Sequence, residues 1–265
     1  MCETCGCGEP GGFTVGTPGE HAHDHSHPHN HSNGASDHNH DHEHSTEKVI
    51  EINKDILFEN NLIAERNRGF FEGRKIFCLN LVSSPGSGKT TLLEKTILAL
   101  KGKISISAIE GDQQSYLDAE RIERTGVSVV QVNTGMGCHL DARMVNIAVQ
   151  KLAIRERSVL FIENVGNLVC PAIFDLGETK RVLVMSVTEG DDKPLKYTAM
   201  FRSASLCIIN KTDLLPYVSF NVDAAIQNAL AVNPSLEFIQ LSATTGEGMQ
   251  VWVDWCLAQS AISYQ

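Results

Sequence analysis

A glycine-rich segment before residue 89 has the composition of a phosphate-binding loop, because an apolar stretch leads through it into a predicted helix. Glycines let backbone N–H groups face phosphate oxygens, and the amino end of a helix favours negative charge. Lys89 is predicted to contact the β- and γ-phosphates, and the Thr90 hydroxyl to bind Mg²⁺. Ser83 replaces the first glycine of the GxxxxGK[ST] motif, an exchange that we expect the loop to tolerate. The predicted nucleotide contacts in this loop are Gly86, Ser87, Gly88, Lys89, Thr90 and Thr91.

The segment Asn210-Lys211-Thr212-Asp213 predicts that the bound base is guanine. The Asp213 carboxylate can accept hydrogen bonds from N1–H and the 2-amino group of guanine, whereas adenine would leave it buried and unpaired. Lys211 is predicted to cover the base with its stem, and Asn210 to join neighbouring loops. Ser242 and Ala243 resemble the SAK-type loop whose backbone contacts guanine. Together with the phosphate loop, these residues favour GTP and GDP and leave ATP as a minor alternative.

Two carboxylates at predicted strand ends are candidates for chemistry at the γ-phosphate. Glu163 ends one strand, and the backbone N–H of Gly166, three residues later, is placed to bind the γ-phosphate. Asp112 ends another strand and is a candidate for orienting the attacking water or contacting Mg²⁺. A solvated carboxylate is the alternative for each. Both carboxylates follow a phosphate loop in the same sheet, which favours a role in chemistry for each. The predicted catalytic residues are therefore Lys89 of the phosphate loop, Asp112 and Glu163.

A metal site is predicted beside the nucleotide. Cys138 and His139 are adjacent and follow a glycine, and Cys170 lies four residues beyond Gly166. Two thiolates and an imidazole suit Ni²⁺ or Zn²⁺ and leave coordination open to a second subunit. The alternative is that both cysteines are small apolar fillers in loops. Three further cysteines lie within apolar stretches and are predicted to be core residues: Cys78, Cys207 and Cys256.

The amino-terminal segment is predicted to be a disordered, metal-binding tail. Residues 1–48 contain no Leu, Ile, Trp or Tyr, which is too little apolar surface to offset the entropy of ordering. Ten of the eleven histidines lie between His21 and His44, where unprotonated imidazoles can bind nickel, copper or zinc. A purification tag is the alternative, although tags are uninterrupted His runs. Cys2, Cys5 and Cys7 have the spacing to bind one ion, with a redox-active cysteine pair as their alternative.

Alternating strand-like and helical stretches must position these residues. Short β-rich runs separated by amphipathic helices predict an α/β fold, a P-loop NTPase with a mostly parallel sheet and helices on both faces. An amphipathic helix from Glu47 to about Gly69 precedes it. The predicted division is a disordered Cys/His-rich tail over residues 1–46 and a P-loop GTPase domain with an N-terminal helix over 47–265. Strands are predicted at Ile76–Ser83, Ile104–Glu110, Ser128–Val132, Val159–Glu163, Val182–Val187, Leu206–Asn210 and Phe238–Leu241, and helices near Thr90–Leu100, Tyr116–Arg124, Asp141–Ala153, Lys193–Phe201, Ala224–Ala231 and Met249–Gln259.

Composition and charge argue against several classes of protein. The formal net charge of the 265 residues is −10, but residues 1–48 alone hold eight acidic side chains and one Lys, so the body is nearly neutral. A general nucleic-acid binder needs a basic face, and no stretch reaches the ~18 consecutive apolar residues of a membrane span. The amino terminus does not resemble a signal peptide, so the eight cysteines are expected to be reduced. We expect a cytoplasmic protein without nucleic-acid or membrane partners.

The chain resembles the HypB family, nickel-incorporation GTPases of hydrogenase maturation that belong to the SIMIBI class and use Glu in an ExxG motif. The resemblance covers the amino-terminal cysteines, the His-rich tract, the phosphate loop, Glu163–Gly166, Asn210–Asp213, and Cys138-His139 with Cys170. It implies a GTP-dependent protein that helps deliver Ni²⁺ to the large-subunit precursor of [NiFe]-hydrogenase. Because hydrolysis would act as a timer that resets the state, we expect slow intrinsic turnover. The resemblance also implies Zn²⁺ or Ni²⁺ bound by Cys138, His139 and Cys170 in a GTP-dependent homodimer, and partnership with the metallochaperone HypA.

The two predicted sites are expected to be linked. GTP with Mg²⁺ would draw Gly166 and Asp112 inward and so reposition Cys170 relative to its fellow metal ligands. Metal affinity, or pairing with a second subunit, would then differ between the GTP and GDP states. A different class remains open, namely a nickel storage or sequestration protein in which the GTPase domain is regulatory. A urease-type nickel GTPase is a related alternative, which the amino-terminal cysteine segment disfavours.

Overall fold

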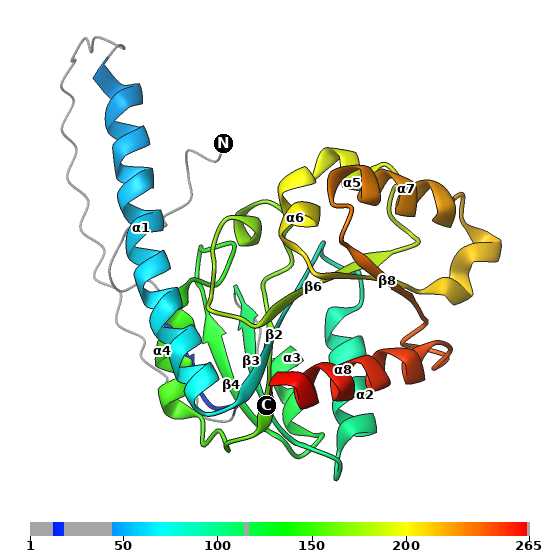
Figure 1. Ribbon diagram of the computed structural model, residues 1–265, viewed down its shortest axis with the longest axis horizontal. Coiled ribbons are helices and arrows are strands. Elements are labelled where there is room, and N and C mark those ends of the chain that lie inside the picture. Colours follow the sequence, from blue (N-terminus) through cyan, green and yellow to red (C-terminus); the bar gives the residue numbers. More distant parts are fainter. Residues whose placement is uncertain (1–12, 19–43, 114–116, 264–265) are drawn as a thin grey trace, which may run out of the picture.

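A central sheet organises the chain in the computed structural model, which describes residues 13–18, 44–113 and 117–263 (Figure 1). The sheet has eight strands in the order β1-β4-β3-β5-β2-β6-β7-β8. All neighbours from β4 to β8 run parallel, and β1 runs antiparallel to β4 at one edge. The strands are β1 (Thr14–Gly16), β2 (Ile76–Ser83), β3 (Ser105–Asp112), β4 (Ser128–Asn133), β5 (Ser158–Glu163), β6 (Lys180–Ser186), β7 (Leu206–Asn210) and β8 (Glu237–Gln240).

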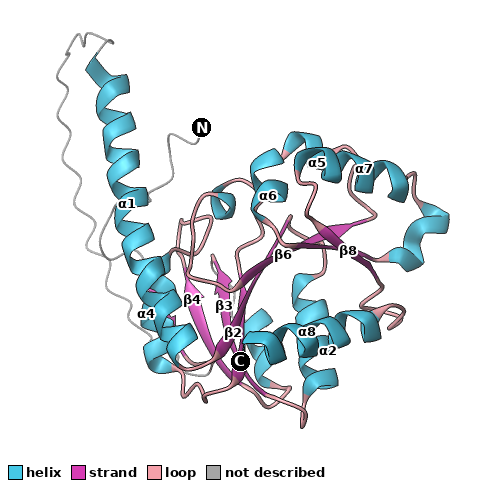
Figure 2. Cartoon of the chain, in the orientation of Figure 1, coloured by secondary structure: helices cyan, strands magenta, loops and turns pink. Residues whose placement is uncertain are grey.

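Helices cover both faces of this sheet (Figure 2). The helices α2, α3 and α8 lie on one face, where Ile97, Ile122 and Trp252 pack against the apolar side chains of the strands. The helices α1 and α4, and farther along the sheet α6 and α7, cover the other face. The helices are α1 (His44–Gly73), α2 (Lys89–Leu100), α3 (Leu117–Glu123), α4 (Ala142–Lys151), α5 (Lys193–Lys196), α6 (Thr198–Ser203), α7 (Val222–Val232) and α8 (Met249–Ser263), and 3₁₀ turns lie at Cys170–Ala172 and Thr212–Tyr217.

The central strands are mostly apolar because both their faces are buried, although buried polar residues such as Asn80 and Glu110 lie within them. Along β2, Ile76 and Cys78 contribute to the core under α4, whereas Phe77 and Leu79 contribute to the core under α2 and α8. Mostly apolar strands with both faces buried are typical of parallel sheets in α/β proteins. The predicted α/β fold with a mostly parallel sheet is therefore confirmed, as are the predicted core positions of the three apolar-stretch cysteines, Cys78, Cys207 and Cys256.

The prediction of disorder throughout the tail was wrong for residues 13–18. Val15 pairs with Val132 of β4, and both Phe13 and Val15 pack against the core beneath α4. The Lys151 side chain, at the end of α4, donates a hydrogen bond to the Val15 carbonyl and helps to hold β1 at the sheet edge. The rest of the predicted tail, up to residue 43, lies outside the described residues.

Element boundaries differ from the predictions where tertiary contacts decide them. Helix α1 begins at His44, within the predicted disordered tail and before the predicted helix start at Glu47. It continues past the predicted end at Gly69 to Gly73, because Phe71 is buried against the sheet. The single helix predicted over 193–201 is divided into α5 and α6 at Tyr197, whose backbone is not helical. Within the described residues, every helix is too short or too polar to cross a bilayer.

Candidate functional site

The loop between β2 and α2 has the geometry of a phosphate-binding loop. Gly88, which precedes the first residue of α2, has φ of +93°, and a Cβ on it would lie 2.7 Å from Asn210 Nδ2, so only glycine fits. The side chain of Lys89 is buried and donates to Ser83 Oγ at 3.0 Å. Ser83, the replacement for the first motif glycine, therefore holds the lysine beside the loop.

Asn210 joins the base-binding segment to the phosphate loop, as predicted. Its Nδ2 donates to the carbonyl of Ser87 at 2.9 Å, and its Oδ1 accepts from the backbone N–H of Ala243 at 3.1 Å. Lys211 Nζ also reaches the phosphate loop, donating to the Gly86 carbonyl at 2.7 Å. The Asp213 Oδ1 atom is buried without a hydrogen-bond partner among the described residues, as suits a carboxylate that accepts from guanine.

The backbone N–H groups of Ser242 and Ala243, predicted to contact the base, already donate hydrogen bonds within the protein. The N–H of Ser242 donates to the Glu247 carbonyl at 2.9 Å, and that of Ala243 donates to Asn210. Both amides are therefore engaged within the protein, and contact with the base through them remains a prediction.

An acidic cluster lies next to the phosphate loop. Thr90 Oγ1 donates to Glu163 Oε1 at 2.6 Å, and oxygen atoms of Glu110, Asp118 and Glu163 lie within 4.8 Å of one another. One oxygen of Glu110 and one of Glu163 are buried without partners among the described residues. Burial, together with the charges of Glu163 and Asp112, raises the pKa of Glu110 to about 9. Carboxylate and hydroxyl oxygens are the ligands that Mg²⁺ prefers, so the residues present fit this ion.

The remaining predicted nucleotide residues line the same cavity of about 540 Å³. Asp112 lies at the end of β3 and accepts at Oδ1 from the backbone N–H of Gln113. Gly166 lies against the phosphate loop, where a Cβ on it would be 3.1 Å from Pro85 Cα. Arg121 of α3 also lines the cavity and donates to Thr91 Oγ1 and Glu94 Oε2. Asp112 and Gly166 thus line one cavity together with Lys89.

Cys138, His139 and Cys170 form a second cluster, called here the thiol–imidazole cluster. The two Sγ atoms are 2.9 Å apart, and Cys138 Sγ is 3.7 Å from His139 Nδ1. The His139 ring is buried and lies against the Phe174 ring, with centroids 4.0 Å apart. Burial lowers the pKa of His139, against an opposing effect of Asp141, and so favours the neutral imidazole that binds metals. This ligand set suits Zn²⁺ or Ni²⁺.

Helix α1 holds the two segments of this cluster together. Asn60 Oδ1 accepts from the N–H of Ala142 at 2.9 Å, and its Nδ2 donates to the Asp175 carbonyl at 2.8 Å. Asn67 likewise donates to the carbonyls of Ala142 and Leu176. Each asparagine therefore bridges the chain that follows Cys138-His139 and the chain that follows Cys170.

The structure brings together most of the predicted residues, and it adds others. Cys2, Cys5 and Cys7, predicted as a metal site, lie outside the described residues. Glu110, Asp118 and Arg121 of the nucleotide cavity were not predicted. The pairing of Glu110 with Glu163 in adjacent strands gives the structural reason that these two carboxylates meet.

Phosphate-loop donors, an acidic cluster and a base-facing carboxylate thus meet where the parallel strands end at their carboxyl edge. This arrangement defines a P-loop nucleotide-binding protein. Residues 77–240 match the family described as "CobW/HypB/UreG, nucleotide-binding domain".

Individual proteins of known sequence or structure show which branch of this class the chain resembles. The chain is 56% identical over 215 residues to the hydrogenase maturation factor HypB of Escherichia coli K12, covering 81% of this chain and 74% of that protein. The crystal structure of HypB from Archaeoglobus fulgidus has a TM-score of 0.71 and 39% identity, covering 76% of this chain and 98% of that one. HypB from Helicobacter pylori, crystallised in complex with nickel, has a TM-score of 0.74 and 36% identity, covering 78% and 97%. The chain belongs to the HypB family of hydrogenase maturation factors.

Proposed function

We propose that the chain hydrolyses GTP and uses the nucleotide state to control nickel binding at the thiol–imidazole cluster, in the service of [NiFe]-hydrogenase maturation. The observation that carries this proposal is that one short stretch of chain serves both sites. Glu163 and Gly166 line the nucleotide cavity, and Cys170, four residues later, belongs to the thiol–imidazole cluster. Any movement of this stretch toward the γ-phosphate moves a metal ligand.

The proposed roles at the nucleotide follow from charge and hydrogen bonding. Lys89 leaves Ser83 to contact the β- and γ-phosphate oxygens, where it offsets the charge that develops during hydrolysis. Asp112 orients the attacking water, and Asp213 accepts from N1–H and the 2-amino group of guanine. Thr90 and Glu163, with Glu110 and Asp118 beside them, would hold Mg²⁺, which when bound neutralises phosphate charge.

A second copy of the chain is the proposed partner of the metal face. Three large apolar side chains flank the thiol–imidazole cluster in sequence and are mostly exposed, namely Met136 (82%), Val169 (61%) and Ile173 (56%). Exposed apolar surface around an incomplete ligand set favours closure by another subunit. We propose that the GTP state pairs two copies here, so that the metal is shared or enclosed.

Nickel is the proposed cargo, and the family context supplies the destination. The Helicobacter pylori relative was crystallised with nickel. The chain is proposed to receive nickel with the metallochaperone HypA and to pass it to the hydrogenase large-subunit precursor, with Zn²⁺ as an alternative ion at the same ligands. Hydrolysis resets the state, so slow intrinsic turnover is expected.

Metal binding and hydrolysis in the full chain test this proposal. Cys2, Cys5 and Cys7 are first changed to Ser, so that thiolate-to-nickel absorption reports the thiol–imidazole cluster. This absorption should appear on nickel addition and vanish in Cys170→Ser, while GTP is hydrolysed and ATP is not. An unchanged band in Cys170→Ser, or hydrolysis of ATP in preference to GTP, would contradict the proposal.

A further inference from the structure

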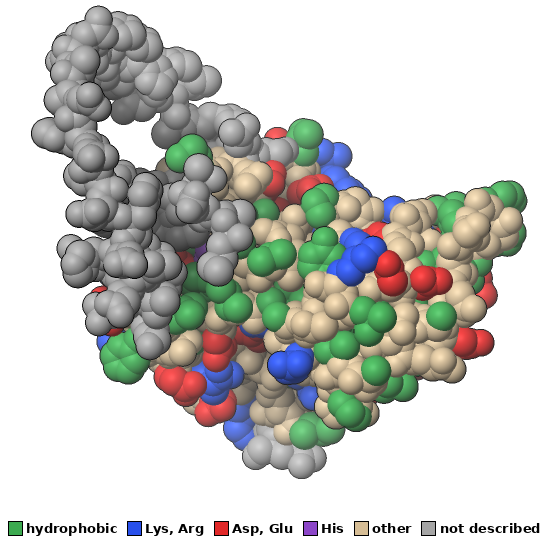
Figure 3. Space-filling model, turned by 90° about the horizontal axis from the view of Figure 1, so that it is seen from above, with side chains coloured by type: hydrophobic (Ala, Val, Ile, Leu, Met, Phe, Trp, Pro, Cys, Tyr) green, Lys and Arg blue, Asp and Glu red, His purple; other side chains and the backbone are tan. Residues whose placement is uncertain are grey.

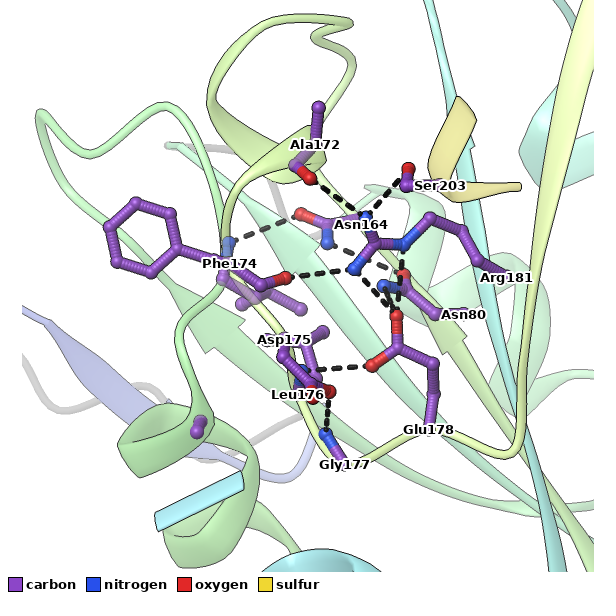
Figure 4. Close-up of polar contacts among 12 residues, drawn as sticks. Asn80, Asn164, Ala172, Phe174, Asp175, Leu176, Gly177, Glu178, Arg181 and Ser203 are labelled. Atoms are coloured by element: carbon purple, nitrogen blue, oxygen red, sulfur yellow. Dashed lines mark hydrogen bonds and ion pairs between the residues drawn. The ribbon is translucent and has the colours of Figure 1, made fainter. Parts of the chain in front are cut away.

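A buried polar network lies between the two sites, and one of its members, Asn164, also lines the nucleotide cavity. It consists of Asn80, Asn164, Glu178 and Arg181, called here the Glu178 network (Figure 4). All four side chains are buried, with at most 7% of any residue exposed. The four residues come from β2, from the loop after β5, and from the two sides of the β6 start. Segments far apart in sequence therefore meet through polar atoms within the core.

One end of the network belongs to the nucleotide-binding segment. Asn164 directly follows Glu163, and its Nδ2 donates to Asn80 Oδ1 at 3.3 Å. Its Oδ1 accepts from the N–H of Val165 at 2.9 Å and from that of Leu140 at 3.1 Å. Because Leu140 is the residue after His139, Asn164 connects the γ-phosphate segment to a segment that carries metal ligands.

The other end of the network holds the chain that follows Cys170. The Arg181 guanidinium donates to the carbonyl of Ala172 at 3.1 Å and to that of Phe174 at 2.9 Å. The ring of Phe174 lies against His139. Arg181 thereby fixes the backbone on the far side of Cys170 and the ring that supports the imidazole (Figure 4).

Glu178 joins the two ends. Its Oε1 accepts from Asn80 Nδ2 at 3.0 Å and from Arg181 Nη2 at 2.7 Å, and its Oε2 accepts from the N–H of Leu176 at 2.8 Å. Burial alone would raise the pKa of Glu178, but Arg181 and the donated hydrogen bonds outweigh it and hold the pKa below its usual value. A buried ion pair adds little stability relative to a well-packed apolar pair, so stability alone does not account for this one.

We propose that the Glu178 network is a positioning relay, which transmits movement of the Glu163–Gly166 segment to the backbone around Cys170 and so sets the geometry of the thiol–imidazole cluster. This inference rests on the proposed function, because it concerns the link between the same two sites. Its four residues are positioning residues, since they contact neither ligand atoms of the cluster nor the phosphate loop through the hydrogen bonds described above.

The test uses Asn80→Leu, which separates Asn164 from Glu178 while leaving both predicted ligand sets intact. The background is the full chain with Cys2, Cys5 and Cys7 changed to Ser. Nickel dissociation constants are measured from thiolate-to-nickel absorption, with GDP and with a non-hydrolysable GTP analogue. Asn233→Leu is the matched control, because Asn233 is also a buried asparagine, donating to the carbonyls of Phe201 and Ala204 away from both sites.

The ratio of the two nickel dissociation constants decides the outcome. Coupling in allosteric proteins is commonly about 5- to 150-fold, and we expect a ratio of this order in the background chain. Asn80→Leu should reduce the ratio by about 2- to 30-fold, while nickel stoichiometry and GDP affinity stay unchanged. Asn233→Leu should lower thermal stability and keep the ratio.

An unchanged ratio in the Asn80 variants overturns the relay. If Asn80→Leu lowers thermal stability but keeps the ratio, as the control does, the network is only structural. If Asn80→Leu fails to fold, Asn80→Ser, which removes the same amide with less steric change, gives the decision by the same criterion. A ratio of one in the background chain refutes the proposed coupling of the sites and the relay with it, whereas a ratio that survives both Asn80 variants refutes the relay alone.

Discussion

Lys89 is buried, is the first residue of α2 and lines the nucleotide cavity. Its hydrogen bond to Ser83 is one that phosphate oxygens can replace, because charge-assisted bonds to phosphate are stronger than a bond to a neutral hydroxyl. The contribution of this residue to hydrolysis is therefore electrostatic, and it is separable from metal binding elsewhere in the chain.

Lys89→Ala tests this separation. GTP hydrolysis should fall by about 100- to 1,000-fold, the usual cost of removing one group that stabilises transition-state charge. Nickel binding in the absence of nucleotide should be unchanged in equilibrium dialysis. Lys95→Ala, at an exposed position on the same helix, is the control and should keep full activity. Loss of nickel binding together with hydrolysis would show that the two functions are not separable.

Asp213 should determine the base. In Asp213→Asn, one carboxylate acceptor becomes an amide donor, so GTP affinity should fall by about 10- to 100-fold. The same donor suits the 2-carbonyl of xanthine, and XTP should restore binding and turnover. Nucleotide titrations with GTP, XTP and ATP measure both effects. Equal loss of affinity for GTP and XTP would mean that Asp213 acts on the fold and not on the base.

The elements that carry the site are only partly encoded in local sequence. Three features were predictable because each depends on residues adjacent in the chain. They are the phosphate loop, with Gly88 next to Lys89, the guanine segment and the seven parallel strands. Strand β1 was not predictable, because three residues form it only by pairing with β4. The asparagine bridges from α1 and the Glu178 network likewise join residues about 75 to 115 positions apart, for which no local pattern exists.

The Glu178 network also makes a prediction about pH. The pKa of Glu178 is lower in the folded chain than its usual value of 4.5, so its contribution to stability is present above about pH 4.5 and is lost as the pH falls through the folded pKa. Glu178→Gln should therefore be less stable than the unmodified chain by about 3–5 kcal/mol at pH 7. The difference should shrink below pH 4.5 in urea unfolding.

Glu72→Gln is the control for this pH dependence, because Glu72 is an exposed residue of α1. It should follow the unmodified chain at every pH. A Glu178→Gln chain whose deficit is the same at pH 7 and at acidic pH would contradict the charged state assigned to Glu178.

At the scale of the molecule, charged side chains are interspersed over the face seen in Figure 3, where Lys and Arg do not gather into one patch. The exposed apolar residues Met136, Val169 and Ile173 are close in sequence to Cys138 and Cys170, so they are the exposed apolar residues proposed for the pairing surface. In the proposed function, nucleotide state, metal binding and pairing of two copies are linked, and such linkage is reciprocal in free energy.

Val169→Asp tests the pairing surface. Two copies would place like charges close together around their shared axis, so the dimer formed with a GTP analogue should weaken by about tenfold or more. Sedimentation of the full chain measures this. Val251→Asp, on α8, is a matched control because Val251 is exposed to a similar extent, 59% against 61% for Val169. Equal effects of the two substitutions would argue against a pairing surface at the metal face.

The most direct measurement is the nickel affinity of the thiol–imidazole cluster in each nucleotide state. With Cys2, Cys5 and Cys7 changed to Ser, nickel is titrated into the full chain in the presence of GDP or a non-hydrolysable GTP analogue, and thiolate-to-nickel absorption is followed. The two nickel dissociation constants should differ by about fivefold or more. Identical constants with both nucleotides would contradict the proposed coupling of the sites, because the stretch from Glu163 to Cys170 would then serve two sites without connecting them.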